Sequence, residues 1–489
     1  DGCSWGNAFP KLQDALTVST AGDEIWVAAG AYYPDEGAGQ TNDSRTSTFR
    51  LKSGVAVYGG FAGAETTRSQ RDPSVNVTVL SGDIGALGAA ADNAYQVVNI
   101  IGSLADVYVL DGFTVTGGNS NGSSGHGGGI YIQNASPALT NLVITNNQAS
   151  ANGAGVYVTS LASVRASYSS PSFSSVIISN NTAARGGGLY TQNSSPVLNN
   201  VSFIGNTATS GAGGGMNNQV LNASTDEYSI PLLDNVTFSG NVARGGAGLF
   251  NNHSYPLLTN VTFSGNTASI RGGAVLNEGA SPIFRNVTFT GNSAPAGTGG
   301  AIRNVVNASG AASNPQIQNS ILWGNGTDEI TSDGTGSTTV ADSIVQGGFG
   351  GTNVLNVNPL LVPLANNGGF TQTHALSAGS PAIDAGGANS ACSSTDQRGV
   401  TRPQGSACDM GAYEYDGFVS ATPTSTPTSA PTFTSTSAPT NTPAPTVTST
   451  PTRSATTWTT ATPGRRSTTW PATGRSSSAW RPAESTSLS

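Results

Sequence analysis

Catalysis by this chain would have to start from its few ionisable side chains, and one of these stands among glycines. His126 lies in the run Gly125-His126-Gly127. Cleavage of a glycosidic bond by acid and base requires two carboxyl groups about 5–10 Å apart. No Asp or Glu occurs between Asp111 and Asp226, which is about four repeats of the chain. We therefore expect His126 to be a corner residue without catalytic partners.

Arginines and acidic residues in the repeated part are the next candidates. A polysaccharide lyase combines acidic Ca²⁺ ligands with a basic residue that removes a proton. Asp328, Glu329 and Asp333 form the densest acidic patch and are the best metal candidates, but a solvated loop explains them better. We assign no catalytic, cofactor-binding or metal-ligating residue and expect no cofactor. The isolated arginines, interpreted as solvated corner charges, are Arg165, Arg185, Arg244, Arg271 and Arg303.

A third set of charged residues surrounds Cys392 and Cys408. A buried ion-pair network that pins a loop-rich module explains these charges as well as catalysis does. The two cysteines lie 16 positions apart and are a disulfide candidate, which leaves Cys3 over. The charged residues are Asp384, Asp396, Arg398, Arg402, Asp409 and Glu414.

The elements that carry these residues repeat along the chain. A glycine cluster and a following apolar residue recur at steps of 26, 33, 27, 33, 26 and 27 positions. Two further markers, the proline of an SP-type turn and a closing asparagine, keep the same period, so the repeat is genuine. The apolar markers are Ile130, Val156, Leu189, Met216, Leu249, Val275 and Ile302. The asparagines are Asn147, Asn181, Asn206, Asn241, Asn266, Asn292 and Asn325.

Each repeat has the pattern of strands. The runs NVTF, NVSF and SVII alternate apolar and polar residues, and Gly, Pro and Asn interrupt every helical reading. One repeat cannot bury its apolar residues, but stacked copies can. The sequence therefore predicts an all-β fold, a right-handed parallel β-helix. This single-stranded solenoid has three short strands in each coil of about 26 residues, end caps and about ten to twelve coils.

Stacking makes a further prediction about the closing asparagines. Coils about 4.8 Å apart place like residues directly above one another. The seven asparagines are then predicted to form a structural ladder of side-chain amides. The same stacking accounts for the low charge content of 9%, because like charges one coil apart repel.

The repeat motifs resemble a known family. GGAV at 272–275 and GGAI at 299–302, with FSGN at 238–241 and 263–266 and FTGN at 289–292, resemble the repeats of chlamydial polymorphic outer-membrane proteins. That resemblance implies a surface β-helix of the adhesin and autotransporter kind, with a pectin-lyase-like fold. Residues 358–415 resemble the choice-of-anchor Q module, which closes many bacterial secreted β-helices. The run at 125–127 resembles the GHG of polygalacturonases, which share this fold but also use clustered aspartates.

Composition and repeat divide the chain into five segments. Residues 1–105 are predicted to hold an N-terminal cap helix and early coils, with the helix at 5–16. Residues 106–346 hold the regular repeats, and 347–418 a C-terminal capping module. Residues 419–452 are predicted to be a Thr/Pro-rich stalk, and 453–489 a disordered tail rich in Arg, Trp and Ser.

Composition also limits the partners and the location. A net charge of −8 argues against nucleic acid, and no apolar run is long enough for an integral membrane segment. The disulfide candidate and the scarcity of lysine favour a secreted, extracellular or cell-surface protein.

We expect a non-catalytic protein, an adhesin-like or extracellular matrix element. Its polar stacked faces would recognise extracellular glycans or a neighbouring surface protein. Two alternatives stay open: a polysaccharide lyase or glycoside hydrolase, and a self-associating structural fibre. A carboxylate cluster across adjacent coils would favour the enzyme, and end-to-end contact would favour the fibre.

Overall fold

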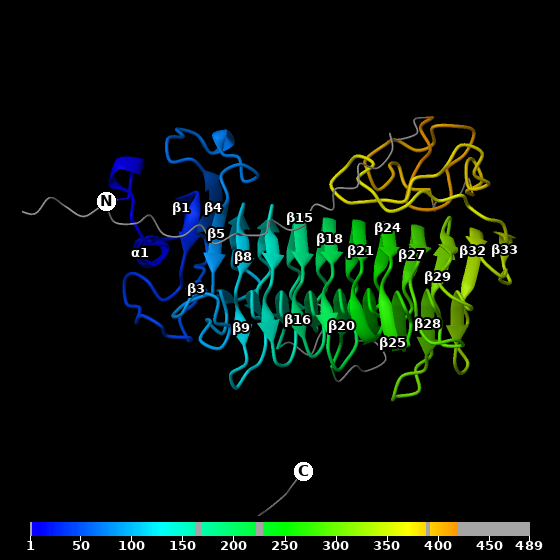
Figure 1. Cartoon of the computed structure of the whole chain (residues 1–489), viewed down its shortest axis with the longest axis horizontal. Coiled ribbons are helices and arrows are strands. Elements are labelled where there is room, and N and C mark those ends of the chain that lie inside the picture. Colours follow the sequence, from blue (N-terminus) through cyan, green and yellow to red (C-terminus); the bar gives the residue numbers. More distant parts are fainter. Residues whose placement is uncertain (1, 162–167, 222–227, 388–391, 418–489) are drawn as a thin grey trace, which may run out of the picture. The chain divides into compact units, whose positions relative to one another are not determined.

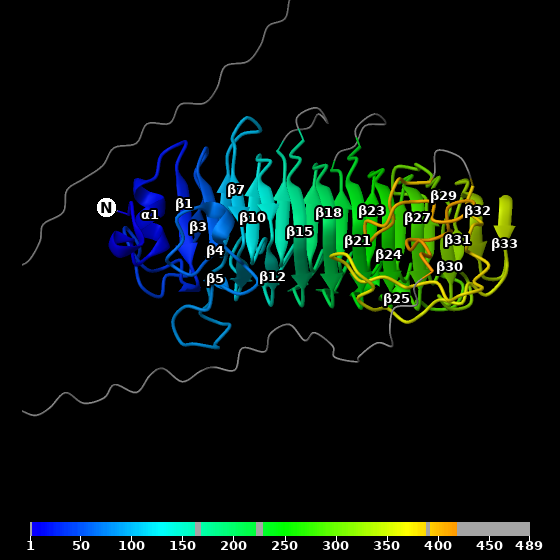
Figure 2. The ribbon, with the colours of Figure 1, turned by 90° about the horizontal axis from the view of Figure 1, so that it is seen from above.

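The computed structural model of the chain describes residues 2–161, 168–221, 228–387 and 392–417. In this part the chain winds through three parallel sheets, here called A, B and C, and each coil adds a strand beside the strand of the coil before (Figures 1 and 2). The predicted parallel β-helix is thereby confirmed. The tail at 419–489 and its tryptophans lie outside the described residues.

Sheet A is the largest, with 17 strands. Its strands are β1 (Glu24–Ala28), β2 (Gly30–Tyr32), β4 (Ala56–Phe61), β5 (Thr78–Ser81), β7 (Val109–Asp111), β8 (Thr114–Thr116), β11 (Ala138–Thr140), β12 (Val143–Thr145), β15 (Ser172–Ser179), β18 (Val197–Ile204), β21 (Leu232–Ser239), β24 (Leu257–Ser264), β27 (Ile283–Thr290), β29 (Gln316–Gln318), β30 (Ile321–Trp323), β32 (Thr339–Val345) and β33 (Thr352–Leu355).

Sheets B and C complete the coil. Sheet B holds β3 (Phe49–Arg50), β6 (Val98–Ile101), β10 (Ile130–Gln133), β14 (Val156–Thr159), β17 (Leu189–Gln192), β20 (Met216–Gln219), β23 (Leu249–Asn252), β26 (Val275–Glu278), β28 (Ile302–Val305) and β31 (Ile330–Ser332). Sheet C holds β9 (Asn119–Ser120), β13 (Gln148–Ala149), β16 (Thr182–Ala183), β19 (Thr207–Ala208), β22 (Val242–Gly245) and β25 (Thr267–Arg271).

The core consists of columns in which like residues stack. Phe203, Phe238, Phe263 and Phe289 lie in register with ring centroids 4.7–4.8 Å apart. A residue with positive φ bends the long strands β15, β18, β21, β24 and β27 of sheet A at their middle, Ser175 (φ +55) in β15 and an asparagine such as Asn260 (φ +53) in the others. This left-handed residue shifts the alternation of side chains, so apolar residues on both sides of it point into the core.

The GGA motif serves the close approach of one coil to the next. Gly272 has φ +62, a conformation that glycine adopts without strain. A Cβ on Gly273 would lie 2.1 Å from the carbonyl oxygen of Gly300 in the next coil. Ala274 then points into the core and is fully buried. Small residues at these three positions let the turn enter sheet B at the stacking distance, and the equivalent turn before β17 is Gly186-Gly187-Gly188.

The N-terminal helix is shorter than the sequence predicts. A short 3₁₀ turn, η1 (Trp5–Asn7), precedes α1 (Leu12–Val18). Pro10 explains the difference, because a proline inside a helix clashes with the preceding turn and lacks an N–H. Leu12 and Leu16 are buried against the first coil. Within the described residues, no helix has the length and apolar character needed to cross a bilayer.

Residues 358–387 and 392–417, here together called the module, pack against the side of sheet A (Figures 1 and 2). The Thr237 hydroxyl donates to the Gln372 carbonyl at 2.7 Å, and Asn260 Nδ2 donates to the Thr395 carbonyl at 2.9 Å. Of the segment 347–418 that the sequence predicts as a C-terminal cap, β33 is the last strand of sheet A, whereas the module covers a lateral face of that sheet. The outward Thr and Asn of the repeats supply the hydrogen bonds that a loop-rich segment needs. The division into five segments stays a prediction.

Candidate functional site

The seven closing asparagines lie together inside the β-helix. The first six donate from Nδ2 to Oδ1 of the next asparagine, over 2.7–3.1 Å. Each of the seven Oδ1 atoms also accepts a backbone N–H. Glu329 ends the ladder and accepts Asn325 Nδ2 at 2.6 Å. Burial raises the pKa of Glu329. These amides are fully engaged in the core, so they stabilise the stack and offer nothing to a ligand.

A second ladder of asparagines inside the β-helix was not predicted from the sequence. Asn218, Asn251, Asn277 and Asn304 of sheet B are all buried, and Nδ2 of each of the first three donates to the next at 2.9–3.0 Å. The same core position is Ile132 in an earlier coil. The signal was present in the aligned runs MNNQ, LFNN, VLNE and IRNV.

His126 is held by aromatic stacking. Its ring lies on Tyr157, with centroids 4.5 Å apart and planes 10° from parallel. Its backbone pairs with that of Asn152, which in turn pairs with Arg185 of the next coil. Burial lowers the pKa of His126, and its Nδ1 has no hydrogen-bond partner in the described part of the chain. The arrangement is that of a packed corner residue.

The other charged residues that the structure describes in the repeats form separate local contacts and do not cluster. Arg271 pairs with Glu278 at 2.6 Å, Arg303 pairs with Asp333, and Asp328 accepts the N–H of Gly297. Arg244 donates to the carbonyl of Ser210 at 3.4 Å. Arg165 lies outside the described residues. No group of three or more His, Cys, Asp or Glu within the described ranges could hold a metal ion.

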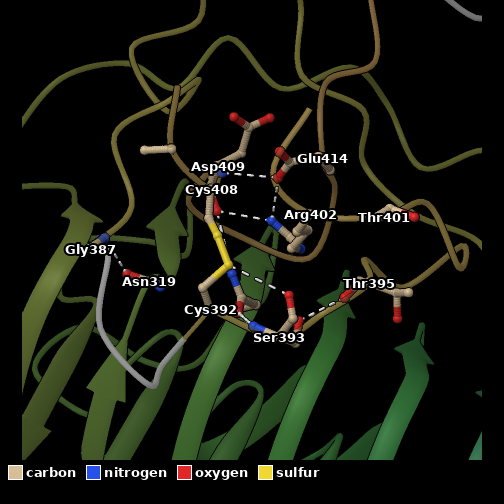
Figure 3. Close-up of a disulfide and its surroundings, with 12 residues drawn as sticks. Asn319, Gly387, Cys392, Ser393, Thr395, Thr401, Arg402, Cys408, Asp409 and Glu414 are labelled. Carbon is tan, nitrogen blue, oxygen red and sulfur yellow. Dashed lines mark hydrogen bonds and ion pairs between the residues drawn. A yellow bond between two sulfur atoms is a disulfide. The ribbon is translucent and has the colours of Figure 1, made fainter. Parts of the chain in front are cut away.

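The charged residues of the module form a network around a disulfide (Figure 3). Cys392 and Cys408 are bonded, with Cα atoms 6.2 Å apart. Arg402 donates to Glu414 at 2.8 Å, and both side chains are almost completely buried. Asp409 accepts the N–H of Asp384 at 2.8 Å. These contacts pin the loops of the module to one another.

Two more of the predicted residues belong to the same network. Arg398 bonds to Asp396 at 2.8 Å and lies over the ring of Tyr413. Asp396 also accepts the N–H of Glu414 at 3.0 Å. All six charged residues singled out in the sequence are therefore brought together, in an arrangement that serves the packing of the module.

Gln397 anchors the module on sheet A. The side chain is 1% exposed. Its Nε2 donates to Thr237 Oγ1 at 2.7 Å and to Thr371 Oγ1 at 2.8 Å, and its Oε1 accepts from Thr262 Oγ1 at 2.7 Å. One glutamine thus joins two successive coils to the module, and nothing in its own sequence context indicates this role.

Outside the module, sheet A presents a continuous row of outward side chains, here called the outer column. It runs through paired positions of successive strands, and the residue before each member is buried in the core. Its members are Trp26, Tyr58, Asp111, Thr140, Ser174, Asn199 and Asp234. The row combines two aromatic rings with hydroxyl, amide and carboxyl groups at the spacing of the coils, about 4.8 Å.

The aromatic end of the outer column is fixed by the loop between β4 and β5. This loop contains the 3₁₀ turn η2 (Arg68–Gln70). The guanidinium of Arg68 lies 4.6 Å from the centroid of the Tyr58 ring and pairs with Glu24. Arg71 pairs with Asp111 at 2.6 Å, and both side chains are largely buried. Both arginines of this loop therefore pair with a carboxylate.

The two carboxylates of the outer column are too far apart to work as a pair. Asp111 and Asp234 are separated by four strand pairings, which at about 4.8 Å each makes about 19 Å. An acid and base pair acts across about 5–10 Å. Asp234 accepts from Asn199 Nδ2 at 3.2 Å, and burial raises its pKa. The column is suited to hydrogen bonding and stacking.

Comparisons with known proteins support the repeat assignment. Residues 175–192, 260–278 and 286–305 match the family model described as the Chlamydia polymorphic membrane protein (Chlamydia_PMP) repeat. No curated protein matches the sequence. One similar solved structure is the crystal structure of pectate lyase Pel9A, with 15% identity, 84% of this chain and 92% of that chain covered, and a TM-score of 0.44. The stacked parallel sheets of this chain and its three matched stretches identify it as a parallel β-helix protein with Chlamydia polymorphic-membrane-protein-type repeats.

Proposed function

We propose that this chain is a non-catalytic, secreted or cell-surface protein, adhesin-like or part of an extracellular matrix, and that its outer column binds glycans. The observation that carries the proposal is the column itself. Thr140, Ser174 and Asn199 present one hydroxyl or amide group in each coil. The spacing of the coils, about 4.8 Å, is close to the length of one sugar unit in an extended glycan. An extended glycan along Thr140, Ser174 and Asn199 would offer hydroxyls to three successive coils, and these weak contacts then act together.

The aromatic residues give the column a preferred starting point. Trp26 is partly exposed and stacks on Phe61, with centroids 4.8 Å apart. The flat apolar face of a sugar packs well on such a ring. The matched repeat carries the name of a membrane protein, which supports a place at a cell surface. Glycans are favoured over neighbouring surface proteins because the column is polar and narrow.

The test is binding of neutral and acidic polysaccharides to the full chain, with analysis of products. Asn199→Ala removes an amide from the column and is expected to weaken binding about tenfold, which corresponds to about 1.4 kcal/mol. Thr207→Ala on sheet C is the matched control and should leave binding unchanged. Equal binding by both variants would show that the outer column is not the binding site. Accumulation of cleaved products would show that the protein is a lyase or hydrolase.

A further inference from the structure

The last strand of sheet A has a free edge. β33 pairs with β32 on one side, with Thr352 opposite Ala341 and Val354 opposite Ser343. No strand of the described residues pairs with its other side, and it lies at the outer end of the row of strands (Figures 1 and 2). A free edge presents a row of unpaired backbone groups to any further strand.

The other ends of the stack are protected. At the N-terminal end, α1 covers the first coil with Leu12 and Leu16. At the C-terminal end of sheet B, β31 is followed by Asp333, which pairs with Arg303 but remains 57% exposed. A charge beside an edge strand opposes the addition of another strand.

β33 lacks such protection. No Asp, Glu, Lys or Arg occurs between Asp342 and Asp384 in the sequence. Asp342 itself accepts Asn353 Nδ2 at 3.0 Å. Beyond the strand, Val357 is 41% exposed and Leu360 is 42% exposed. The last strand of sheet A thus carries no charged residue, its outer side is unpaired within the described residues, and exposed apolar side chains border it, with Asp342 of the preceding strand as the nearest charge.

We propose that this edge pairs with the same edge of a second copy of the chain. A twofold axis through the edge places β33 of one copy antiparallel to β33 of the other, so sheet A continues into the partner through one antiparallel pair. A twofold interface brings each residue near its own copy, where any charge would meet a like charge. An uncharged edge therefore fits a second copy. Because α1 covers the opposite end, the assembly stops at a dimer and does not grow into a fibre.

The test is sedimentation velocity of the full chain over a range of concentrations. A Cys3→Ser background excludes a dimer linked by that thiol. The native edge is expected to give a dimer whose share rises with concentration. Thr352→Lys with Val357→Lys places two charges at the edge and is expected to give a monomer. Val75→Lys with Leu87→Lys, at residues that are 73% and 77% exposed in the N-terminal part, is the matched control and should remain dimeric.

Hydrogen exchange locates the contact. The amides of residues 352–355 are expected to exchange more slowly as the dimer forms. The edge variant should show no such slowing, provided that its melting temperature equals that of the native chain. A chain that stays monomeric at every concentration would overturn the proposal, as would a dimer with unprotected β33 amides or a mass that grows beyond two copies. Glycan binding is measured separately, so this proposal and the proposed function can fail independently.

Discussion

The asparagine ladder gives the sharpest prediction of stability. Asn241 lies in its middle and is fully buried. Its Nδ2 donates to Asn266 Oδ1 at 2.9 Å and to the Phe203 carbonyl at 3.0 Å, while its Oδ1 accepts the backbone N–H of Asn206 at 3.0 Å and Asn206 Nδ2 at 3.1 Å. Asn241→Ala removes all four hydrogen bonds and brings no water to replace them.

The expected loss in the free energy of unfolding follows from the polar groups that lose a hydrogen-bond partner. The backbone N–H of Asn206 loses its acceptor, and the carbonyl of Phe203 loses a donor. An unsatisfied buried polar group costs about 1–3 kcal/mol, so the free energy of unfolding should fall by about 3–5 kcal/mol. Thr182→Ala changes an exposed residue of β16 and should cost within about 1 kcal/mol.

The assay is urea unfolding followed by circular dichroism, with hydrogen exchange to resolve individual coils. Neighbouring coils of a solenoid depend on each other, so Asn241→Ala should lower protection in the coils on both sides of the change. Equal midpoints for Asn241→Ala and Thr182→Ala would refute the reasoning, because they would mean that the ladder contributes no more than a surface hydroxyl.

Three further predictions concern the module, its pH response and the core. Gln397→Ala should loosen the module from sheet A, and faster hydrogen exchange at Thr262 would show it, since the side chain joins two coils. Burial raises the pKa of Asp409 to about 6 from the ordinary aspartate value of 3.8. The native state therefore keeps this proton longer than the unfolded state, so stability should fall as the pH rises through this interval. Asp409→Asn should reduce the loss of stability between pH 4 and pH 7 in urea titrations, and the partly buried Asp234 and the buried Glu329 account for a remaining slope of the same sign. Phe238→Ala interrupts the stacked phenylalanines and should cost about 3–5 kcal/mol in the same unfolding assay.

Local pattern and period were sufficient to predict the architecture and its inner columns. Contacts in a β-helix join equivalent residues of successive coils, so a period near 26 indicates which residues meet. Asn241 and Asn266 can be paired from their spacing alone, and Phe238 and Phe263 likewise. The second ladder shows the limit of that approach, because Asn251 occupies a position that is apolar in earlier coils, and no single motif marks the change.

The sequence by itself thus determined the repeat, the parallel stack and the small residues at its turns, because each depends on neighbours one period away. The tertiary structure alone decided where the module packs and which outward residues remain open. Gln397 meets Thr262 across 135 positions of chain, and no periodic signal records that contact. The outer column likewise depends on the register through repeats with insertions, since Ser174 and Asn199 pair across 25 positions but Asn199 and Asp234 across 35. Contacts between equivalent positions of neighbouring repeats can be predicted from the period, whereas the contacts of a segment that folds back on the repeats depend on the tertiary structure.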